Sequence, residues 1–328
     1  MRSICHYRCL TAGLVIVTLF LLLGCEQKAP KAFKWRLQSQ ATKSSLDYKQ
    51  LIEFSKYVDV MSAGRLQITP FSAGEVVSGP DIFNAVQERR VEMGNGWPNW
   101  WSAQHPAWAI MNAGPFDFME IDASMMFFIA GPGTDMANEL SKPLGVIWRP
   151  AWWPGMEFGL LSREPILGLD DLKGKRVRIG PGLPSEVLSE ASGASTLPLV
   201  PDQIGPAFKS GQIDAVEWTT AAGVLDLNLH GIGKHALVPA IWQPSVVSDF
   251  LINEAALAEL PTDLKTMLET AIKRYTLETT LKSKVADIAS LEKLKEEGVK
   301  LHQWSQDDIV RWRTANDKIV SEYKNNHE

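Results

Sequence analysis

Two hydrophobic periods alternate in the chain, one typical of strands and one typical of helices. Apolar and polar residues alternate over 33–38, which predicts a strand, and apolar residues recur at helical spacing over 45–62. A second predicted strand covers 66–69, a helix follows over 81–90, and a third strand begins within 91–94. Strands that alternate with helices indicate an α/β fold with parallel strands.

The same pattern begins again in the second half of the chain. A predicted turn over 170–175 precedes a strand over 176–179, and helices follow over 185–191 and 201–209. The next strand is Ile213-Asp214-Ala215-Val216. A chain of 328 residues also exceeds the size of one compact core. Two βαβ units in separate halves therefore predict two lobes that face one another.

From Pro261 onward the chain is charged and strongly helical in pattern. One set of residues follows a 3.6-residue period over many turns: Leu264, Leu268, Ile272, Tyr275, Leu281, Val285 and Ile288. We expect an amphipathic helix that packs across the two lobes through this face. A coiled coil or homodimer arm is the alternative, but the irregular heptad repeat favours the packed helix.

The first residues form a leader rather than part of either lobe. Two arginines precede an apolar run over 10–23, which is too short to span a bilayer and suits the core of a signal peptide. The end of the run, Leu22-Leu23-Gly24-Cys25, resembles a bacterial lipobox. This resemblance implies a lipoprotein signal peptide over 1–24, a lipid on Cys25, and a tether over 25–32. The alternative is an ordinary signal peptide followed by an incidental cysteine.

Cysteine content and charge exclude several classes of function. The other two cysteines, Cys5 and Cys9, lie inside the leader, so the predicted mature body has no disulfide and no thiol nucleophile. Removal of the leader leaves 31 basic against 38 acidic residues, a charge of −7. This charge argues against a nucleic-acid partner.

Catalytic motifs are absent from the sequence. There is no HExxH, no GxSxG, no Walker-type phosphate loop, and no GxGxxG after a predicted strand. The histidines that follow the leader are scattered, without the spacing of metal ligands: His105, His230, His235, His302 and His327. We therefore expect a protein that is not an enzyme.

Charged residues end two of the predicted strands in the second half. Glu217-Trp218 follows the strand 213–216, and a carboxylate at the edge of a core carries a desolvation cost unless it is paired. Arg176 and Arg178 share one face of the strand before it, and ligands bind at the carboxyl ends of strands in α/β sheets. A guanidinium fits a carboxylate through two parallel hydrogen bonds. Periodicity does not choose between the two arginines.

Tryptophan is unusually frequent. Nine of the twelve tryptophans lie between Trp97 and Trp242, and two adjacent pairs occur at 100–101 and 152–153. Adjacent residues cannot face the same side of a strand, so some of these rings lie in loops, where aromatic residues commonly line small-molecule pockets. For any single tryptophan, packing in a core is the alternative.

These features together resemble a known family. From about Phe33 to Tyr323 the chain is similar to the DctP-like solute-binding proteins of TRAP (tripartite ATP-independent periplasmic) transporters. The segments most specific to the resemblance are 171–178, 201–218, 239–244 and the helix start at Leu260-Pro261. The resemblance implies a two-lobed, periplasmic-binding-protein-like α/β fold with a long C-terminal helical region that crosses the lobes. Lobe I would comprise 33–153 with about 247–280, and lobe II 154–246 with about 281–328.

Within the family, the chain is most similar to receptors for 2-oxo and 2-hydroxy acids. This branch implies that Arg178 clamps the substrate carboxylate. It also implies a metal cation, Ca²⁺ or Na⁺, held by Glu217 and by the backbone carbonyl of Trp218. Trp218 would also contact the substrate.

Other site residues follow from the same resemblance. Trp100 and Trp101 occupy positions where the branch usually has tyrosines over the pocket, and Trp242 lies in the segment that closes the other side. The branch normally has a glutamine about twenty residues before the arginine, and a count without gaps places Glu157 there as a ligand of substrate and metal. Two carboxylates at one site either recruit a divalent cation or raise each other's pKa.

The resemblance implies a periplasmic receptor, anchored by the lipid on Cys25, that delivers a small organic acid to a TRAP permease in the inner membrane. Transport energy would come from an ion gradient in that partner, because the chain has no nucleotide-binding motif. Two alternatives remain open. One is a receptor for a zwitterion such as ectoine or taurine, held in a tryptophan cage. The other is the binding protein of an ABC transporter.

Overall fold

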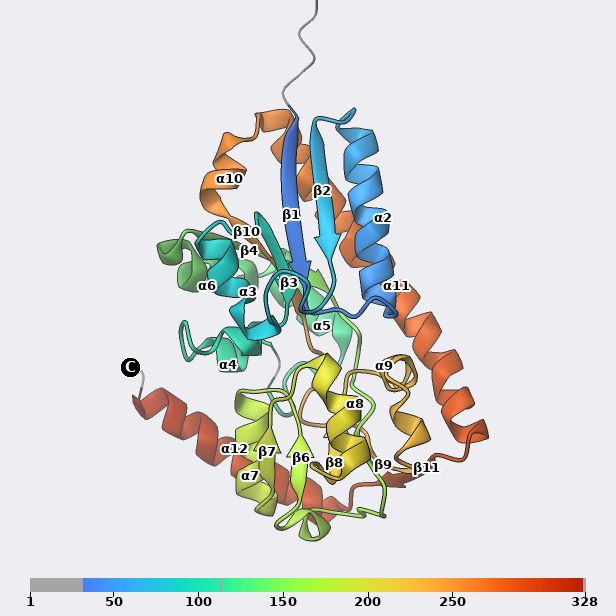
Figure 1. Ribbon diagram of the computed structural model, residues 1–328. Helices are drawn as coiled ribbons and strands as arrows, with labels where there is room; N and C mark the ends of the chain where they lie inside the picture. Colours follow the sequence, from blue (N-terminus) through green and yellow to red (C-terminus); the bar gives the residue numbers. More distant parts are fainter. Residues whose placement is uncertain (1–31, 113, 327–328) are drawn as a thin grey trace, which may run out of the picture.

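The computed structural model describes residues 32–112 and 114–326, and two sheets divide this part of the chain into an upper and a lower lobe (Figure 1). The predicted signal peptide, Cys25 and most of the predicted tether lie outside the described residues. In the part that is described, no helix combines the length and the apolar character needed to cross a bilayer.

The upper lobe contains a five-stranded mixed sheet in the order β2-β1-β3-β10-β4. β1 pairs in parallel with β2 and β3, whereas β10 pairs antiparallel with β3 and β4. The strands are β1 (Phe33–Ser39), β2 (Leu66–Phe71), β3 (Met93–Gly96), β4 (Val146–Trp152) and β10 (Ser248–Asn253).

The lower lobe contains a six-stranded mixed sheet in the order β11-β9-β5-β8-β6-β7. β6 is parallel to β7 and β8, and β9 is parallel to β11, but β5 is antiparallel to both β8 and β9. The strands are β5 (Leu160–Ser162), β6 (Arg176–Arg178), β7 (Ser195–Leu197), β8 (Ala215–Glu217), β9 (His235–Val238) and β11 (Lys300–Gln303).

The predicted parallel strands are present in both lobes, but each sheet also contains a strand that runs antiparallel to its neighbours, and the path of the chain explains why. β5 and β10 are the first strands that the chain forms after it crosses from the opposite lobe. Each enters its sheet from the side that faces the other lobe, whereas the strands of the βα units end on that side. The two crossing strands must therefore run antiparallel to their neighbours.

The helices confirm most of the predicted pattern. The helix predicted over 45–62 is α2, and its N-cap residue Ser45 accepts a hydrogen bond from the backbone amide of Tyr48 at 3.5 Å. The helices are α2 (Leu46–Met61), α3 (Ile82–Gln87), α4 (Trp108–Met111), α5 (Ile121–Met125), α6 (Gly133–Ser141), α7 (Leu183–Ser192), α8 (Pro201–Ser210), α9 (Ala221–Asp226), α10 (Glu254–Glu259), α11 (Thr262–Glu296) and α12 (Gln306–Asn326). A π-helical turn, Met126–Ala130, and several short 3₁₀ turns complete the structure.

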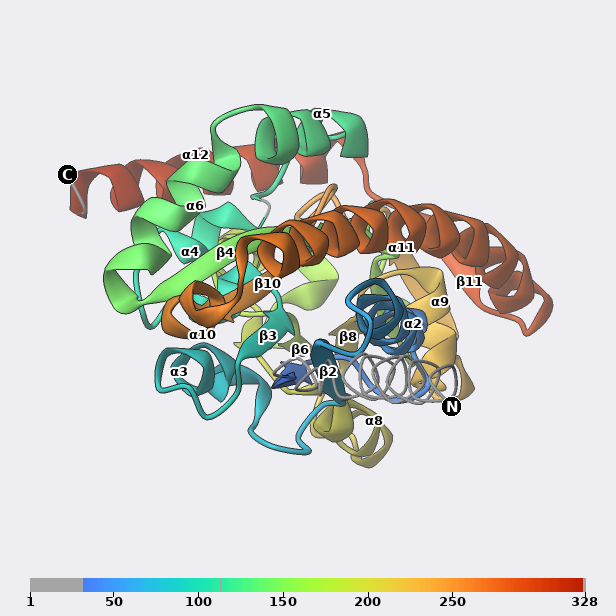
Figure 2. The same cartoon turned by 90° about the horizontal axis from the view of Figure 1, so that it is seen from above.

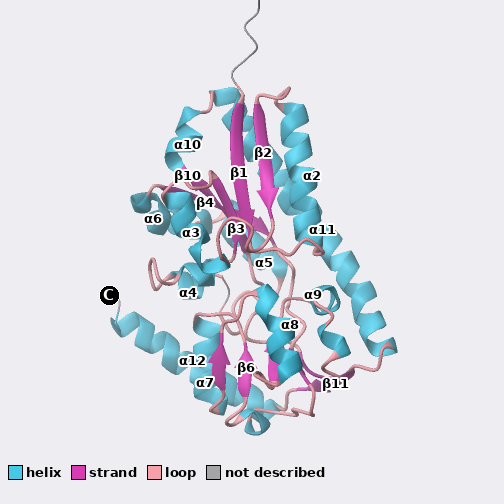
Figure 3. Ribbon diagram, viewed as in Figure 1, coloured by secondary structure: helices cyan, strands magenta, loops and turns pink. Residues whose placement is uncertain are grey.

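Helices cover both faces of each sheet. In the upper lobe, α2 and α11 pack on one face, while α3 and α6 pack on the other. In the lower lobe, α7 and α12 share one core with the sheet, and α8 and α9 share the second. The loops that connect strands to helices converge between the two sheets (Figure 3). Ligands of layered α/β proteins bind where such loops converge.

The helix α11 is 35 residues long and contacts α2 and β4 in the upper lobe and α9 in the lower lobe (Figure 2). The first half of its predicted apolar face is buried, but Leu281, Val285 and Ile288 are 55%, 71% and 71% exposed. Small hydroxyl side chains take the buried positions instead: Thr276, Thr279, Thr280 and Ser283. The predicted face is therefore wrong beyond Tyr275.

Candidate functional site

Three strands end at the interface between the lobes and place residues there. Trp97 directly follows β3, Gly180 follows β6, and Trp218 follows β8. A cavity of about 30 Å³ lies among these strand ends. Its main lining side chains come from both lobes and from the crossover segment: Trp97, Trp100, Glu157, Arg178, Glu217 and Trp218.

Arg178 is the only arginine or lysine that lines this cavity among the described residues, and it is 3% exposed. Its Nη1 donates to the backbone oxygen of Glu217 at 2.7 Å and to Oε2 of Glu217 at 2.9 Å, and its Nε donates to the Leu199 oxygen at 3.1 Å. The guanidinium carbon lies 4.9 Å from the ring centre of Trp218. Among the described residues, none accepts a hydrogen bond from Nη2.

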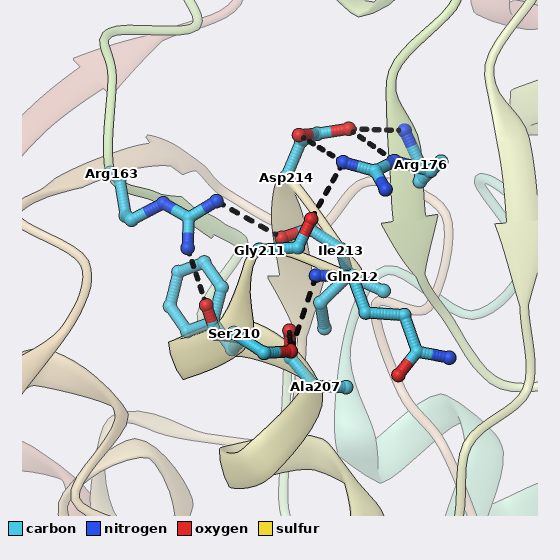
Figure 4. Close-up of polar contacts among 9 residues, drawn as sticks. Arg163, Arg176, Ala207, Ser210, Gly211, Gln212, Ile213 and Asp214 are labelled. Atoms are coloured by element: carbon cyan, nitrogen blue, oxygen red, sulfur yellow. Dashed lines mark hydrogen bonds and ion pairs between the residues drawn. The ribbon is translucent and has the colours of Figure 1, made fainter.

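Of the two arginines of β6, only Arg178 lines the cavity. Arg176 is exposed, and its Nη2 donates to Oδ1 of Asp214 at 2.9 Å and to the Gly211 oxygen at 2.7 Å, as Figure 4 shows. These bonds fix the link between α8 and β8 at the end of the sheet away from the cavity. Both side chains are on one face of the strand, but only Arg178 lies at its carboxyl end.

Glu217 is the acid that ends β8, and it is 3% exposed. Besides the bond from Arg178, its Oε2 accepts from the Gly180 amide at 3.2 Å, and its Oε1 accepts from the Thr219 amide at 3.1 Å. The carboxylate at the end of this strand is therefore paired with the arginine of the neighbouring strand and held by two backbone amides.

Glu157 lies in the crossover segment between β4 and β5 and is 6% exposed. Its Oε2 has no hydrogen-bond partner. Burial, and next the negative charge of Glu217, raise the pKa of Glu157 well above its ordinary value, while Arg178 lowers it. The cavity thus holds two carboxyl groups and one guanidinium, one carboxyl oxygen being unpaired.

This set of groups fits a cation that prefers oxygen ligands. No cluster of three or more His, Cys, Asp or Glu side chains with metal-binding geometry occurs within residues 32–112 and 114–326. The side chains of Glu157 and Glu217 could therefore supply only part of a coordination shell. Backbone carbonyls, such as that of Trp218, and oxygens of a bound ligand would have to complete it.

Only some of the tryptophans predicted to line the site do line this cavity. Trp100 and Trp218 line it, but Trp101 and Trp242 do not. Trp101 is buried and donates its Nε1 proton to Oδ2 of Asp249 at 2.7 Å. Trp242 is fully buried, and its ring stacks on that of Trp312 with centroids 5.6 Å apart.

Both of these rings belong to hydrophobic cores, because the backbone at each position directs the side chain away from the cleft. Trp100 and Trp101 are adjacent on the 3₁₀ turn Pro98–Trp101, so their side chains point in different directions. Trp100 lines the cavity, whereas Trp101 packs in the core. Trp97 lines the cavity but was not singled out as a site residue from the sequence. Its position directly after the predicted third strand is the signal that could have identified it.

Comparisons with known proteins give one consistent result. Residues 37–326 match the family DctP, described as bacterial extracellular solute-binding protein, family 7. A monocarboxylate 2-oxoacid-binding periplasmic protein from Nostoc sp. is 29% identical over 274 residues, which cover 84% of this chain and 74% of that protein.

Solved structures are similar over almost the whole chain. A TRAP periplasmic solute-binding protein from Pseudoalteromonas atlantica, with bound sodium and pyruvate, is 27% identical with a TM-score of 0.84. One from Colwellia psychrerythraea, with bound calcium and pyruvate, is 25% identical with the same TM-score. In each comparison the match covers 89% of both chains.

Proposed function

Because the chain belongs to family 7 of the bacterial extracellular solute-binding proteins, the receptors of TRAP transporters rather than enzymes, we propose that its ligand is a 2-oxo or 2-hydroxy monocarboxylate bound together with a metal cation. The observation that carries this proposal is the buried Arg178, whose Nη2 has no acceptor among the described residues. The relatives from Pseudoalteromonas and Colwellia, with pyruvate and a cation bound, support it.

The carboxylate of the ligand would bind Arg178. Nη1 and Nε are held by Glu217 and Leu199, so the guanidinium is already oriented before a ligand arrives. A carboxylate that accepts from Nη2 forms a charge-assisted hydrogen bond in a site shielded from water. Pre-orientation reduces the entropy lost on binding.

The cation would be held by Glu217, Glu157 and the backbone carbonyl of Trp218. When bound, it would neutralise the carboxylates and coordinate an oxygen of the ligand. A bound cation would favour the ionised form of Glu157, whose pKa burial and Glu217 otherwise raise, and the carboxylates of Glu157, Glu217 and the ligand would then carry a surplus of negative charge over the one arginine. A divalent cation such as Ca²⁺ balances this surplus, and the unpaired Oε2 of Glu157 is a suitable oxygen ligand.

Binding between the lobes would couple ligand capture to lobe closure. Trp97 and Trp100 come from the upper lobe, whereas Arg178 and Glu217 come from the lower lobe, so only the closed arrangement offers all four to one ligand. We assign 33–153 with about 247–280 to lobe I, and 154–246 with about 281–328 to lobe II. The crossings after β4 and before β10 support this division.

The family is periplasmic, and the closed receptor would deliver its ligand to a TRAP permease in the membrane. Cys25 lies outside the described residues, and the lipobox-like Leu22-Leu23-Gly24-Cys25 supports a lipid anchor there. Globomycin, which inhibits lipoprotein signal peptidase, should leave the precursor uncleaved if the lipid is attached.

Replacement of Arg178 tests the proposed binding mode. Arg178→Lys keeps the positive charge beside Glu217 but loses the fork geometry, so the affinity for pyruvate in calcium should fall by at least tenfold. Arg176→Lys, on the same strand but outside the cavity, is the matched control and should bind within twofold of the wild type. Isothermal titration calorimetry measures both. Wild-type affinity in Arg178→Lys and in a folded Arg178→Ala would contradict the assignment.

A further inference from the structure

Among the described residues, the cleft between the lobes contains at least three cavities, and these three share Trp97 and Trp218. Besides the cavity at Arg178, a second cavity has a volume of about 60 Å³ and a third of about 180 Å³. The third also shares Trp100 with the cavity at Arg178. A ligand whose carboxylate lies at Arg178 therefore has two directions in which the rest of the molecule can extend.

The third cavity, called the side-chain chamber below, is formed by both lobes. The upper lobe contributes Gln40, which follows β1, and the rings of Trp97 and Trp100, while the lower lobe contributes Pro201 of α8 and Trp218. A cavity of about 150 Å³ is large enough for benzene, so 180 Å³ accommodates a group of about six or seven non-hydrogen atoms. Three indole rings around such a space favour a flat group.

Gln40 gives the chamber a polar contact. The residue is 7% exposed, and its Nε2 has no hydrogen-bond partner. Two glycines leave room for the amide and confine it. A β-carbon at Gly79 would lie 3.1 Å from Nε2, and one at Gly96 would lie 3.2 Å from Cδ. An unpaired buried donor is costly, so a ligand that brings an acceptor to Nε2 gains affinity.

The charges of the lining residues restrict the ligand further. No Lys, Arg or His side chain lines the chamber among the described residues, whereas the exposed acid Asp202 does. A second carboxylate on the ligand would therefore find a negative charge and no cation. The 60 Å³ cavity is smaller and carries two carboxylates, Asp47 and Asp226, which makes it a poor site for the remainder of an organic anion.

We propose that the side-chain chamber binds the substituent of the ligand, so that the substrates are 2-oxo or 2-hydroxy monocarboxylates with a flat, uncharged side chain of about six or seven non-hydrogen atoms. A hydrogen-bond acceptor on that side chain pairs with Gln40 Nε2. The inference rests on the proposed function, because it uses Arg178 as the site of the carboxylate. It excludes pyruvate as the preferred ligand, since a methyl group leaves the chamber unfilled.

Titration calorimetry with four acids tests the inference on the purified protein in calcium. The acids are pyruvate, phenylpyruvate, 4-hydroxyphenylpyruvate and 2-oxoglutarate. Both aromatic acids should bind at least tenfold more tightly than pyruvate, and 2-oxoglutarate should bind most weakly. The phenol oxygen can accept from Gln40, so 4-hydroxyphenylpyruvate should bind about fivefold more tightly than phenylpyruvate.

Three variants locate the effect in the chamber. Ala73→Phe fills the chamber and should remove the preference for aromatic acids while the affinity for pyruvate stays within twofold. Gln40→Met keeps the size of the side chain without the donor and should remove only the advantage of the phenol. Ala222→Leu narrows the 60 Å³ cavity and should leave all affinities within twofold.

Different results would overturn different parts of the account. If pyruvate binds as tightly as the aromatic acids, or if Ala73→Phe weakens both equally, the chamber assignment is wrong and the proposed function stands. If no monocarboxylate binds while the protein is folded by circular dichroism, both are wrong.

Discussion

At the scale of single residues, the centre of the site is a buried ion pair that contributes little to the free energy of folding. Arg178 and Glu217 are 3% exposed each, and their bond is 2.9 Å long. A buried ion pair gains little net free energy of folding, because desolvation offsets the attraction, but removal of one partner is strongly destabilising. Under the proposed function, ligand binding would give this pair a role that an apolar pair of equal volume could not perform.

Asp249 is another buried acid, and it gives the protein a pH-dependent free energy of unfolding. Its Oδ2 accepts hydrogen bonds from the indoles of Trp101 and Trp148 at 2.7 and 2.8 Å. Burial nevertheless raises the pKa of Asp249 to about 7. The folded protein therefore holds a proton on Asp249 at pH values where the unfolded chain has lost it. The stabilising contribution of this proton to the free energy of unfolding is complete below about pH 4 and is lost as the pH rises to about 7.

Asp249→Asn should remove this dependence, because an amide keeps an acceptor for the two indoles and does not titrate. Relative to the wild type, the variant should gain stability by up to about 4 kcal/mol as the pH rises from 4 to 7. Urea unfolding at several pH values in that window measures the difference. Parallel profiles for the two proteins would show that Asp249 is ionised throughout.

How far the site could be predicted also depends on single residues. The position of Arg178 and Glu217 at the cavity was predictable, because each ends a strand whose pattern is clear and both strands end at one edge of a sheet. Trp101 and Trp242 were not, because an apolar ring fits a pocket and a core equally well. Only the direction of the backbone at each position decides between the two, and that direction depends on distant contacts such as the bond from Trp101 to Asp249.

At the scale of elements, α11 shows why a hydrophobic period can mislead. Near the upper lobe the helix buries large apolar residues such as Leu268 and Tyr275, as predicted. Farther along, it passes close to the crossover backbone, where the Trp153 amide donates to Oγ1 of Thr280 at 3.1 Å. Only small side chains fit against a backbone at that distance. The apolar residues Leu281, Val285 and Ile288 of α11 are exposed, and the homodimer arm stays a prediction.

Thr280→Val should therefore destabilise the protein, although it replaces a hydroxyl in a helix by a methyl group of similar size. The Trp153 amide would lose its acceptor in a buried position, at a cost of about 1–3 kcal/mol in the free energy of unfolding. Thr266→Val, on the exposed part of the same helix, is the matched control and should cost under about 0.5 kcal/mol. Equal effects of the two variants in urea unfolding would rule out this role of Thr280.

At the scale of the whole molecule, the two sheets and the crossing segments explain how a receptor forms one site from separate parts of the chain. The βα units place strand ends of both lobes at one interface, and the crossing segment before β5 adds Glu157 between them. The two-lobed plan was predictable from the repeated strand and helix pattern. The antiparallel strands were not, because they follow from the crossings rather than from local periodicity.

The central claim is that the site takes an organic monocarboxylate and a cation together. The most direct test is a calorimetric titration of the purified protein with pyruvate, in sodium-free buffer with calcium and again with a chelator. The account predicts binding in calcium and an affinity at least tenfold weaker in the chelator, because the cation that would coordinate an oxygen of the ligand is then absent. Equal affinity in both buffers would contradict it.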